Sequence, residues 1–176
     1  MNSLSTKKVK IMAKKIKIEP IGYTSVDERS HKYQIQVREE YRSALKELDK
    51  FSDVFVIWWA NQQDNPDARS QTKVNAEELP PFYGKDAPTM GIFATRSEYR
   101  PNPVAISALK IKSIDVKTGT ISFMWMDAFD DTPIIDLKPY IPMSDLINTA
   151  EVPDYLQHWP KNAEDAAKWW AEQFTS

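Results

Sequence analysis

The stretch Gly91–Ser107, GIFATRSEYRPNPVAIS, shows most directly how this chain folds. It begins as a strand, passes through a polar loop with Arg96 and Arg100, and re-enters a strand after Pro101-Asn102-Pro103. Each proline fixes its own φ at about −65° and keeps the preceding residue extended. Covalent geometry therefore holds the backbone of Arg100 and Asn102 in an extended conformation. A loop stiffened in this way loses little entropy on binding a ligand, which makes it a candidate binding loop. A plain strand connection with two solvated arginines is the alternative.

Alternating or β-branched residues predict strands on both sides of this loop. The segment 53–60, DVFVIWWA, is almost continuously apolar and should be buried on both faces of a sheet. Turns at 116–119 and 128–132 join the last three predicted strands and favour antiparallel pairing between them. The predicted strands are 15–23, 33–37, 53–60, 89–95, 104–115, 120–127 and 133–137.

Two segments have the pattern of helices. Apolar residues in 38–48 recur at i, i+3, i+4 and i+7, which predicts a helix with one apolar face. Asn162 is a candidate N-cap, with Asp165 at the third position of a C-terminal helix 162–174. The polar segment 61–88 is expected to be a functional or mobile loop, or to contain a short element. The fold class is therefore mainly β: a small antiparallel β-barrel of six or seven strands, with one short helix after the second strand and a C-terminal helix.

Composition limits the classes of function. The chain has 176 residues and no cysteine, so disulfides and thiolate metal sites are excluded, and its two histidines are too far apart in sequence to favour a metal site. No apolar run is long enough to cross a membrane, and a cytoplasmic protein is expected. Six of the 23 basic residues precede Glu19, which leaves 17 basic against 25 acidic residues in the body. An acidic body argues against a broad nucleic-acid footprint but allows a local basic patch.

We expect three parts along the chain: a disordered basic tail (1–14), a β-barrel domain (15–150) and a C-terminal extension (151–176) with no further domain after it. The tail is lysine-rich and lacks the apolar core of a secretory signal. Such a tail is most often solvated and contributes little beyond solubility.

Two motifs in order resemble the TsaA-like family, also called the TrmO family. ATRSEYRPNPVAIS (94–107) is followed by DDTPIIDLKPYIP (130–142), and EYRSALKELDKFSDVFVIWWANQ (40–62) resembles the helix and central strand of that family. The resemblance covers about residues 16 to 147. It implies a small β-barrel methyltransferase that uses S-adenosylmethionine and works as a homodimer. The family's best-known activity is methylation of the exocyclic amine of N6-threonylcarbamoyladenosine, beside the anticodon of threonine-accepting tRNA.

The resemblance also implies a set of site residues. Arg96 can offer a planar fork to a carboxylate of the cofactor or of the acceptor. The acylated acceptor nitrogen is a poor nucleophile, so a carboxylate that accepts its proton would help, and Asp136 and Asp130 are the candidates. Asp136 can equally be a surface partner of Lys138. The expected cofactor-binding residues are Asn61, Gln62, Arg96, Ile106, Asp130, Asp131, Thr132 and Pro133. The expected substrate-binding residues are Arg100, Asn102, Lys138 and Tyr140, with Arg100 placed to reach a tRNA phosphate.

Four positions depart from the family pattern. Asn61 and Asp53 stand where relatives usually have histidine, and Ala105 and Asp131 each replace a glycine near the expected ligand. These exchanges keep open the alternative of a barrel that has lost catalysis and serves as a binding module. The acidic body favours a second alternative, a methyltransferase that acts on a small molecule.

Overall fold

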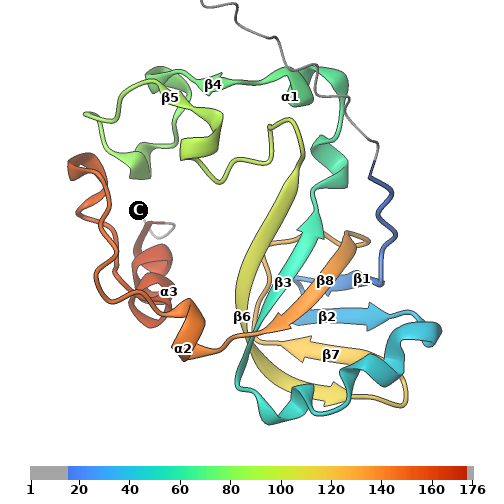
Figure 1. Ribbon diagram of the computed structural model, residues 1–176. Coiled ribbons are helices and arrows are strands. Elements are labelled where there is room, and N and C mark those ends of the chain that lie inside the picture. The colour runs from blue at the N-terminus through green and yellow to red at the C-terminus, as the bar shows by residue number, and fades with distance from the viewer. Residues whose placement is uncertain (1–15, 174–176) are drawn as a thin grey trace, which may run out of the picture.

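A computed structural model describes residues 16–173, and its centre is a closed six-stranded barrel (Figure 1). Neighbouring strands are all antiparallel, in the order β1-β2-β7-β6-β3-β8. The fold class expected from the sequence is therefore confirmed. The strands are β1 (Gly22–Asp27), β2 (Lys32–Val37), β3 (Asp53–Trp59), β6 (Val104–Asp115), β7 (Thr120–Phe123) and β8 (Pro133–Pro139).

The barrel interior explains why the alternating segments form strands. Val54 and Val56 of β3 are fully buried, while the residues between and beside them are half-buried. Ile35, Ile121 and Ile134 enter the same core from three other strands. Because successive side chains of a strand point to opposite faces, this spacing closes one apolar interior.

The first strand lies later in the chain than the alternation at 15–23 predicts, and that prediction is wrong. Residues 16–20 are irregular and the strand runs from Gly22 to Asp27. Gly22 begins the strand because β2 passes very close: a Cβ there would lie 2.4 Å from the backbone oxygen of Gln36. A glycine expected to end a strand instead permits two strands to approach. The predicted tail, residues 1–14, lies outside the described residues.

The helix predicted over 38–48 is not an α-helix. Two 3₁₀ turns replace it, and Glu47 separates them with φ +69°, in the left-handed region. An α-helix cannot continue through that conformation. The strand predicted over 89–95 is likewise short: β5 covers only Met90–Gly91 and a 3₁₀ turn follows. The 3₁₀ turns of the chain are Glu39–Leu45, Leu48–Lys50, Asn61–Gln63, Ala76–Glu78, Pro81–Tyr83, Ile92–Ala94 and Asp154–Leu156.

Residues 61–99 form an arm that stands beyond the end of β3 (Figure 1). The arm contains α1 (Pro66–Ser70) and a two-stranded sheet of β4 (Lys73–Val74) and β5. The long polar segment thus contains short elements of its own.

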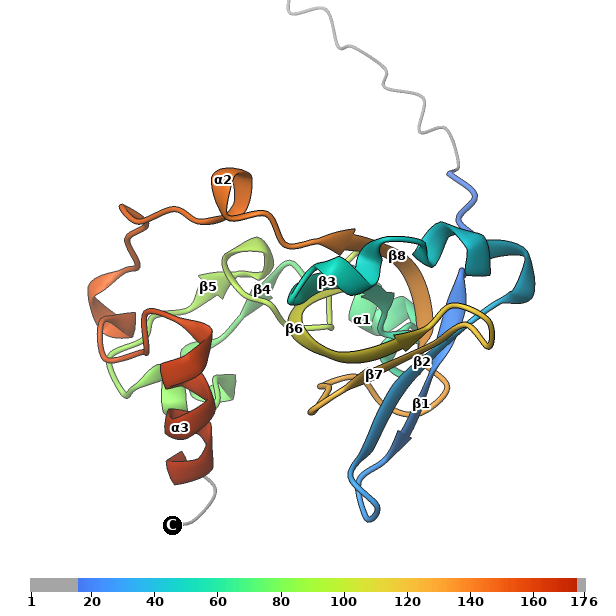
Figure 2. The same ribbon diagram turned by 90° about the horizontal axis from the view of Figure 1, so that it is seen from below.

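After β8 the chain passes through α2 (Pro142–Asp145) and then, as the C-terminal extension, around to the arm (Figures 1 and 2). The extension carries α3 (Ala163–Gln173). The predicted cap is present, because the Asn162 Oδ1 accepts a 2.8 Å hydrogen bond from the Asp165 amide. Among residues 16–173, no helix combines the length and apolarity that a membrane span needs.

Candidate functional site

A cleft of about 240 Å³ lies where the end of β3 meets the loop before β6 and the turn before β8. The end of β3 is hydrogen-bonded to the loop before β6, since the Ala60 amide donates a 2.8 Å hydrogen bond to the Pro103 carbonyl. Val104 and Ile106 of β6 are 40% and 45% exposed, so the cleft offers apolar surface to a ligand. The lining residues are Trp58, Ala60, Asn61, Gln63, Arg96, Glu98, Arg100, Val104, Ala105, Ile106, Asp127, Phe129 and Thr132.

The two arginines of the proline-stiffened loop have different surroundings. Nη1 of Arg100 donates to the carbonyls of Thr95 and Ser97, at 3.2 and 3.4 Å, and its guanidinium lies over the Phe93 ring. Arg100 therefore holds its own loop together. Arg96 is exposed at the cleft and makes no hydrogen bond or ion pair with any other residue of 16–173. Its guanidinium remains available to an anionic group of a ligand.

A chain of hydrogen bonds leads from the barrel wall to a carboxylate in the cleft. Trp58 Nε1 donates to Ser107 Oγ at 2.9 Å, and Ser107 Oγ donates to Asp127 Oδ1 at 2.6 Å. Ser107 is only 6% exposed, so this relay is shielded from water on one side. It fixes one oxygen of Asp127 and leaves the other free to act on a ligand.

The turn before β8 is held by Thr24. Its hydroxyl donates to the Phe129 carbonyl at 2.6 Å and accepts from the Thr132 amide at 2.7 Å. Asp130 is a turn former, because its Oδ1 accepts from the Val26 amide at 2.8 Å. Asp131 has φ +56°, a conformation that aspartate tolerates better than most residues. The aspartate in place of glycine therefore leaves the turn intact.

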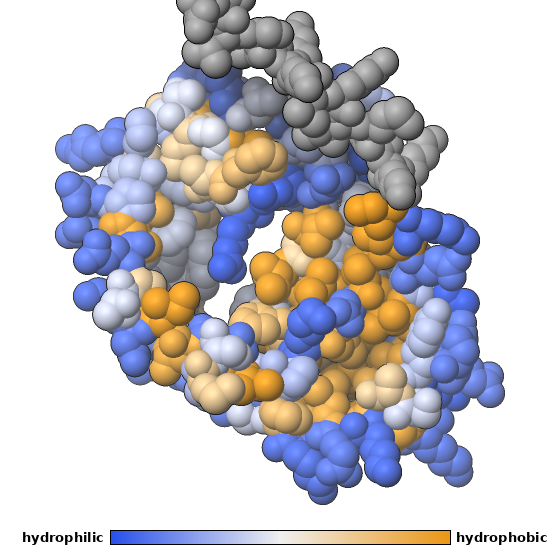
Figure 3. All heavy atoms as spheres, viewed as in Figure 1, coloured by the Kyte–Doolittle hydropathy of each residue, from blue (hydrophilic) through white to orange (hydrophobic). Residues whose placement is uncertain are grey.

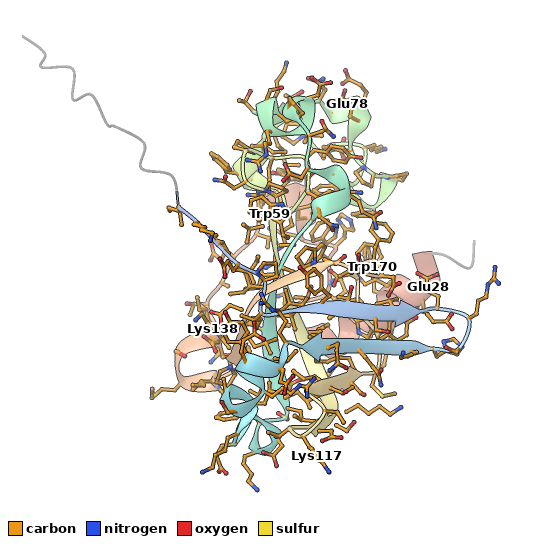
Figure 4. The ribbon with its side chains drawn as sticks, turned by 90° about the vertical axis from the view of Figure 1, so that its right-hand side faces the viewer. Glu28, Trp59, Glu78, Lys117, Lys138 and Trp170 are labelled. Carbon is orange, nitrogen blue, oxygen red and sulfur yellow. The ribbon has the colours of Figure 1, made fainter. Side chains whose placement is uncertain are left out.

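A second network fixes the rim of the cleft beside Asn61. Asp64 accepts from Trp59 Nε1 and from Arg69 Nη2, both at 2.9 Å, and the Arg69 guanidinium lies over the Trp59 ring. The hydrogen bond from Arg69 holds the pKa of Asp64 below its usual value. Figure 4 shows Trp59 between the barrel and the arm, where this network ties the two together.

The structure brings five of the predicted site residues into the cleft and leaves the others outside it. The residues in the cleft are Asn61, Arg96, Arg100, Ile106 and Thr132. Those that do not line it are Gln62, Asn102, Asp130, Asp131, Pro133, Asp136, Lys138 and Tyr140. The last of these, Tyr140, packs on Phe55 at a ring distance of 5.5 Å.

Asp136, the first candidate for a base, lies elsewhere. It lines a different cavity beside Leu45 and Leu48, and its Oδ2 pairs with Lys138 Nζ at 2.8 Å. That contact raises the pKa of Lys138. Figure 4 shows Lys138 at the edge of the barrel, well below Trp59. A catalytic Asp136 stays a prediction that its position in this structure does not favour.

Sequence reasoning did not assign Asp127, Glu98 or Phe129 to the site. In the sequence Asp127 looks like one more turn-forming aspartate, and it comes beside Ser107 through the pairing of β6 with β7. One usable signal was the Trp58-Trp59 pair, because adjacent strand residues face opposite sides and one of them can line a pocket. Trp58 does line the cleft.

The residues of the cleft fit the cofactor that the motifs imply. S-adenosylmethionine carries a carboxylate, a sulfonium cation and an adenine ring. Arg96 suits the carboxylate, Asp127 and Glu98 suit a cation, and Ile106 with Phe129 offers apolar surface to a ring. Within residues 16–173, no group of acidic, histidine or cysteine residues could hold a metal ion.

Comparison with known proteins identifies the family. The model of the tRNA-methyltransferase O N-terminal domain matches residues 16–146. An S-adenosyl-L-methionine-binding protein from Archaeoglobus fulgidus is 30% identical over 118 residues, which is 67% of this chain and 76% of that protein. A probable S-adenosyl-L-methionine-binding protein from Pyrococcus horikoshii is 32% identical over 69% of this chain and 80% of its own length.

Two further comparisons concern named members of the family. The tRNA (adenine(37)-N6)-methyltransferase of Escherichia coli is 32% identical over 73% of this chain, but only 52% of that protein is covered. The crystal structure of TrmO from Pseudomonas aeruginosa aligns with 94% of this chain and 76% of its own, with a TM-score of 0.61 at 19% identity. That likeness concerns the fold. The chain belongs to the tRNA-methyltransferase O family, as its two motifs indicated, and residues 16–146 are the family's N-terminal domain.

Proposed function

We propose that this protein is an S-adenosylmethionine-dependent methyltransferase that acts on tRNA, and that its acceptor is the exocyclic amine of N6-threonylcarbamoyladenosine in threonine-accepting tRNA. The observation that carries the proposal is the cleft itself, where the unpaired Arg96 and the oriented carboxylate of Asp127 line the same space. The names of the relatives support the cofactor, and the name of the E. coli relative supports an adenine of tRNA as the acceptor.

The residues of the cleft have distinct parts in this reaction. Bound S-adenosylmethionine supplies an electrophilic methyl group. Arg96 holds a carboxylate, and the stiff loop before β6 keeps that contact in place without reordering. The free oxygen of Asp127 accepts the proton that the acceptor nitrogen loses, while Ser107 and Trp58 hold the carboxylate in position. Alignment of the acceptor with the methyl group supplies the remaining acceleration.

A homodimer and a cytoplasmic location, both predicted from the sequence, belong to this proposal. Apolar side chains stay exposed in the single chain: Phe129, which lines the cleft, is 55% exposed, and Trp125, in the same segment after β7, is 53% exposed. A second copy of the chain would remove such surface from water. Light scattering at micromolar protein tests this, with a mass of two chains expected and a single-chain mass contradicting it.

Cofactor binding is the first experiment. Ligand at about 100 times its dissociation constant should stabilise the fold by roughly 2.7 kcal/mol, which is visible as a rise in melting temperature. Arg96→Gln should abolish most of that rise, whereas Arg29→Gln, in the β1–β2 hairpin, changes the same charge far from the cleft and should retain it.

The second experiment measures transfer of a labelled methyl group to threonine-accepting tRNA. Methylation of tRNA that carries N6-threonylcarbamoyladenosine, with none on tRNA that lacks the modification, is the expected result. In the first experiment, no rise in melting temperature at millimolar cofactor would contradict the proposal of an enzyme and favour a non-catalytic barrel.

A further inference from the structure

A larger cavity, of about 750 Å³, lies between the arm and the C-terminal extension, next to the cleft. The arm contributes Leu79, Phe82, Tyr83 and Tyr99, and the extension contributes Trp159 and Trp170. Figure 3 shows the molecule hollowed between the barrel, the arm and the extension. Its size falls within the range of roughly 300–1,000 Å³ that is usual for small-ligand sites.

Specific contacts build the walls of this cavity. The Phe82 carbonyl accepts a 2.8 Å hydrogen bond from Trp159 Nε1 and lies 2.9 Å from His158 Nε2. Phe82 also meets Trp170 edge to face at 4.9 Å, and Tyr83 meets Trp159 at 5.1 Å. Tyr155 donates to the sulfur of Met90 at 3.2 Å. The extension, which lies beyond the matched family domain, is therefore docked on the arm by directed bonds as well as by apolar contact.

The chemistry of the lining favours an uncharged, flat ligand. Most of the surface is aromatic or aliphatic, and burial raises the pKa of the Tyr83 hydroxyl, as expected for a site of low polarity. Lys73 and Arg96 are offset in formal charge by Glu78 and Glu98. The Glu78 carboxylate is already engaged, because it accepts from the amide and side chain of Asn75. Aromatic side chains bind flat rings by stacking, and this contact depends little on which ring is bound.

The cavity and the cleft share a boundary. Arg96 and Glu98 line both spaces, so a ligand in the cavity reaches the same two side chains as a cofactor in the cleft. Methyl transfer requires the two reacting atoms to approach within about 3–3.5 Å, which only neighbouring sites allow.

We propose that this second cavity is a binding site for a neutral, planar aromatic ring of the methyl acceptor, with the C-terminal extension as one wall. The acceptor role rests on the proposed function, because it assumes that the cofactor occupies the cleft. The ring belongs either to a free small molecule or to a base turned out of an RNA loop, and both present the same chemistry to the cavity.

The test uses 2-naphthamide, a neutral planar probe, titrated by tryptophan fluorescence and calorimetry into the full chain saturated with S-adenosylhomocysteine. We expect one site per chain, with quenching because Trp159 and Trp170 line the cavity. The anionic 2-naphthoate, which has the same rings, should bind several-fold more weakly. A parallel titration omits S-adenosylhomocysteine, and binding of 2-naphthamide that is seen only in its absence would overturn the proposal, because the probe would then occupy the cleft.

Two variants locate the probe. Leu79→Trp fills the cavity and should lower the affinity for 2-naphthamide at least tenfold, and Tyr99→Ala removes an exposed ring from the lining and should lower it by about tenfold. Ile147→Trp adds the same ring at a position that is 66% exposed and outside the lining, and should change nothing. Unchanged binding in both cavity variants would overturn the proposal.

Cofactor affinity keeps the two proposals separate. Leu79→Trp should bind S-adenosylmethionine as the wild type does, since Leu79 lies outside the cleft. Absence of cofactor binding in the wild type would defeat the proposed function and leave the cavity a ring-binding site. If Leu79→Trp also lowers methyl transfer to tRNA, the ring is an RNA base. If the wild type binds both cofactor and probe but methylates no tRNA, the ring belongs to a free small molecule. Unchanged transfer to tRNA in Leu79→Trp while probe binding is lost would overturn the acceptor role of the cavity.

Discussion

Asp127 is the carboxylate whose position in the cleft is best defined. Its Oδ1 is occupied by Ser107, which itself accepts from Trp58, so the second oxygen has a fixed direction before any ligand arrives. Preorganisation of this kind distinguishes it from Asp130, whose Oδ1 bonds the Val26 amide, and from Asp136, which pairs with Lys138. At the scale of single residues, Asp127 is therefore the strongest candidate for the base.

Replacement of Asp127 tests that role directly. Asp127→Asn keeps the size of the side chain and an oxygen for Ser107, but cannot accept a proton. Since general base catalysis typically contributes about 10²–10⁴-fold, kcat for methyl transfer should fall by about 100-fold or more. The affinity for S-adenosylmethionine should change much less, because Arg96, the apolar wall and the second carboxylate suited to the cation, Glu98, remain. Asp131→Asn, at an exposed turn outside the cleft lining, is the matched control, and a normal kcat in Asp127→Asn would remove the base assignment.

Among the elements, the junction between β3 and the arm carries the rim of the cleft. Asp64 fixes the Trp59 side chain and anchors Arg69 of α1, so the turn at Asn61–Gln63 is held from both ends. The pKa of Asp64 is lowered in the folded chain, chiefly by the hydrogen bond from Arg69. A lowered folded pKa stabilises the protein above the unfolded pKa, and that contribution is lost as the pH falls through the folded pKa.

The stability of Asp64→Asn should consequently depend on pH. At neutral pH we expect a loss of about 1 kcal/mol in the free energy of unfolding, a moderate value because the pair is partly exposed. The difference from wild type should shrink below about pH 4, where protonation of Asp64 removes the same interaction from the wild type. Urea unfolding at several pH values measures both effects. Asp67→Asn, which changes one charge in the first turn of α1, is the control and should not show this pH dependence. A loss in Asp64→Asn that stayed constant down to pH 2.5 would refute the assigned cause.

The elements that the sequence predicted well are those in which local pattern and tertiary burial agree. In β3 and β6 the β-branched residues and the alternation coincide with the barrel interior, and the Asn162 cap begins α3 as expected. The failures have definite causes. The left-handed conformation of Glu47 interrupts a good helical pattern, and Gly22 serves a close contact with β2 that depends on the pairing of distant strands.

Prediction of the site was limited for the same reason. Arg96 and Ile106 could be placed because they lie within one continuous motif. Asp127 comes just after β7, and the relay to it depends on the pairing of β6 with β7, which includes a register shift between Ile111 and Ser113. Such an irregularity leaves no pattern in the sequence. Asp136 matched a motif but lines a different cavity, because it pairs with Ile57 further along β8 than the turn at Thr132 that lines the cleft.

For the molecule as a whole, the extension follows β8 in the chain and packs on the arm. Its directed contacts are concentrated at Phe82, whose carbonyl meets both Trp159 and His158. The sequence predicts the extension as a separate part, residues 151–176, and that boundary stays a prediction. A part that is anchored at few points can open by itself while the barrel remains folded.

Trp159→Phe distinguishes local opening of the extension from unfolding of the whole chain. The change keeps an aromatic ring near Tyr83 but removes the Nε1 donor to Phe82, a loss worth about 1 kcal/mol in the local opening equilibrium. Amides of α3 should then exchange with deuterium about fivefold faster, while amides of β3 and β6 keep their wild-type rates, because their hydrogen bonds lie within the closed barrel. Tyr23→Phe, at a position of β1 that is 39% exposed and outside the extension, is the control and should leave all rates unchanged. Faster exchange throughout the barrel would mean that the extension and the barrel unfold together, and the anchoring at Phe82 would then belong to the global stability of the chain.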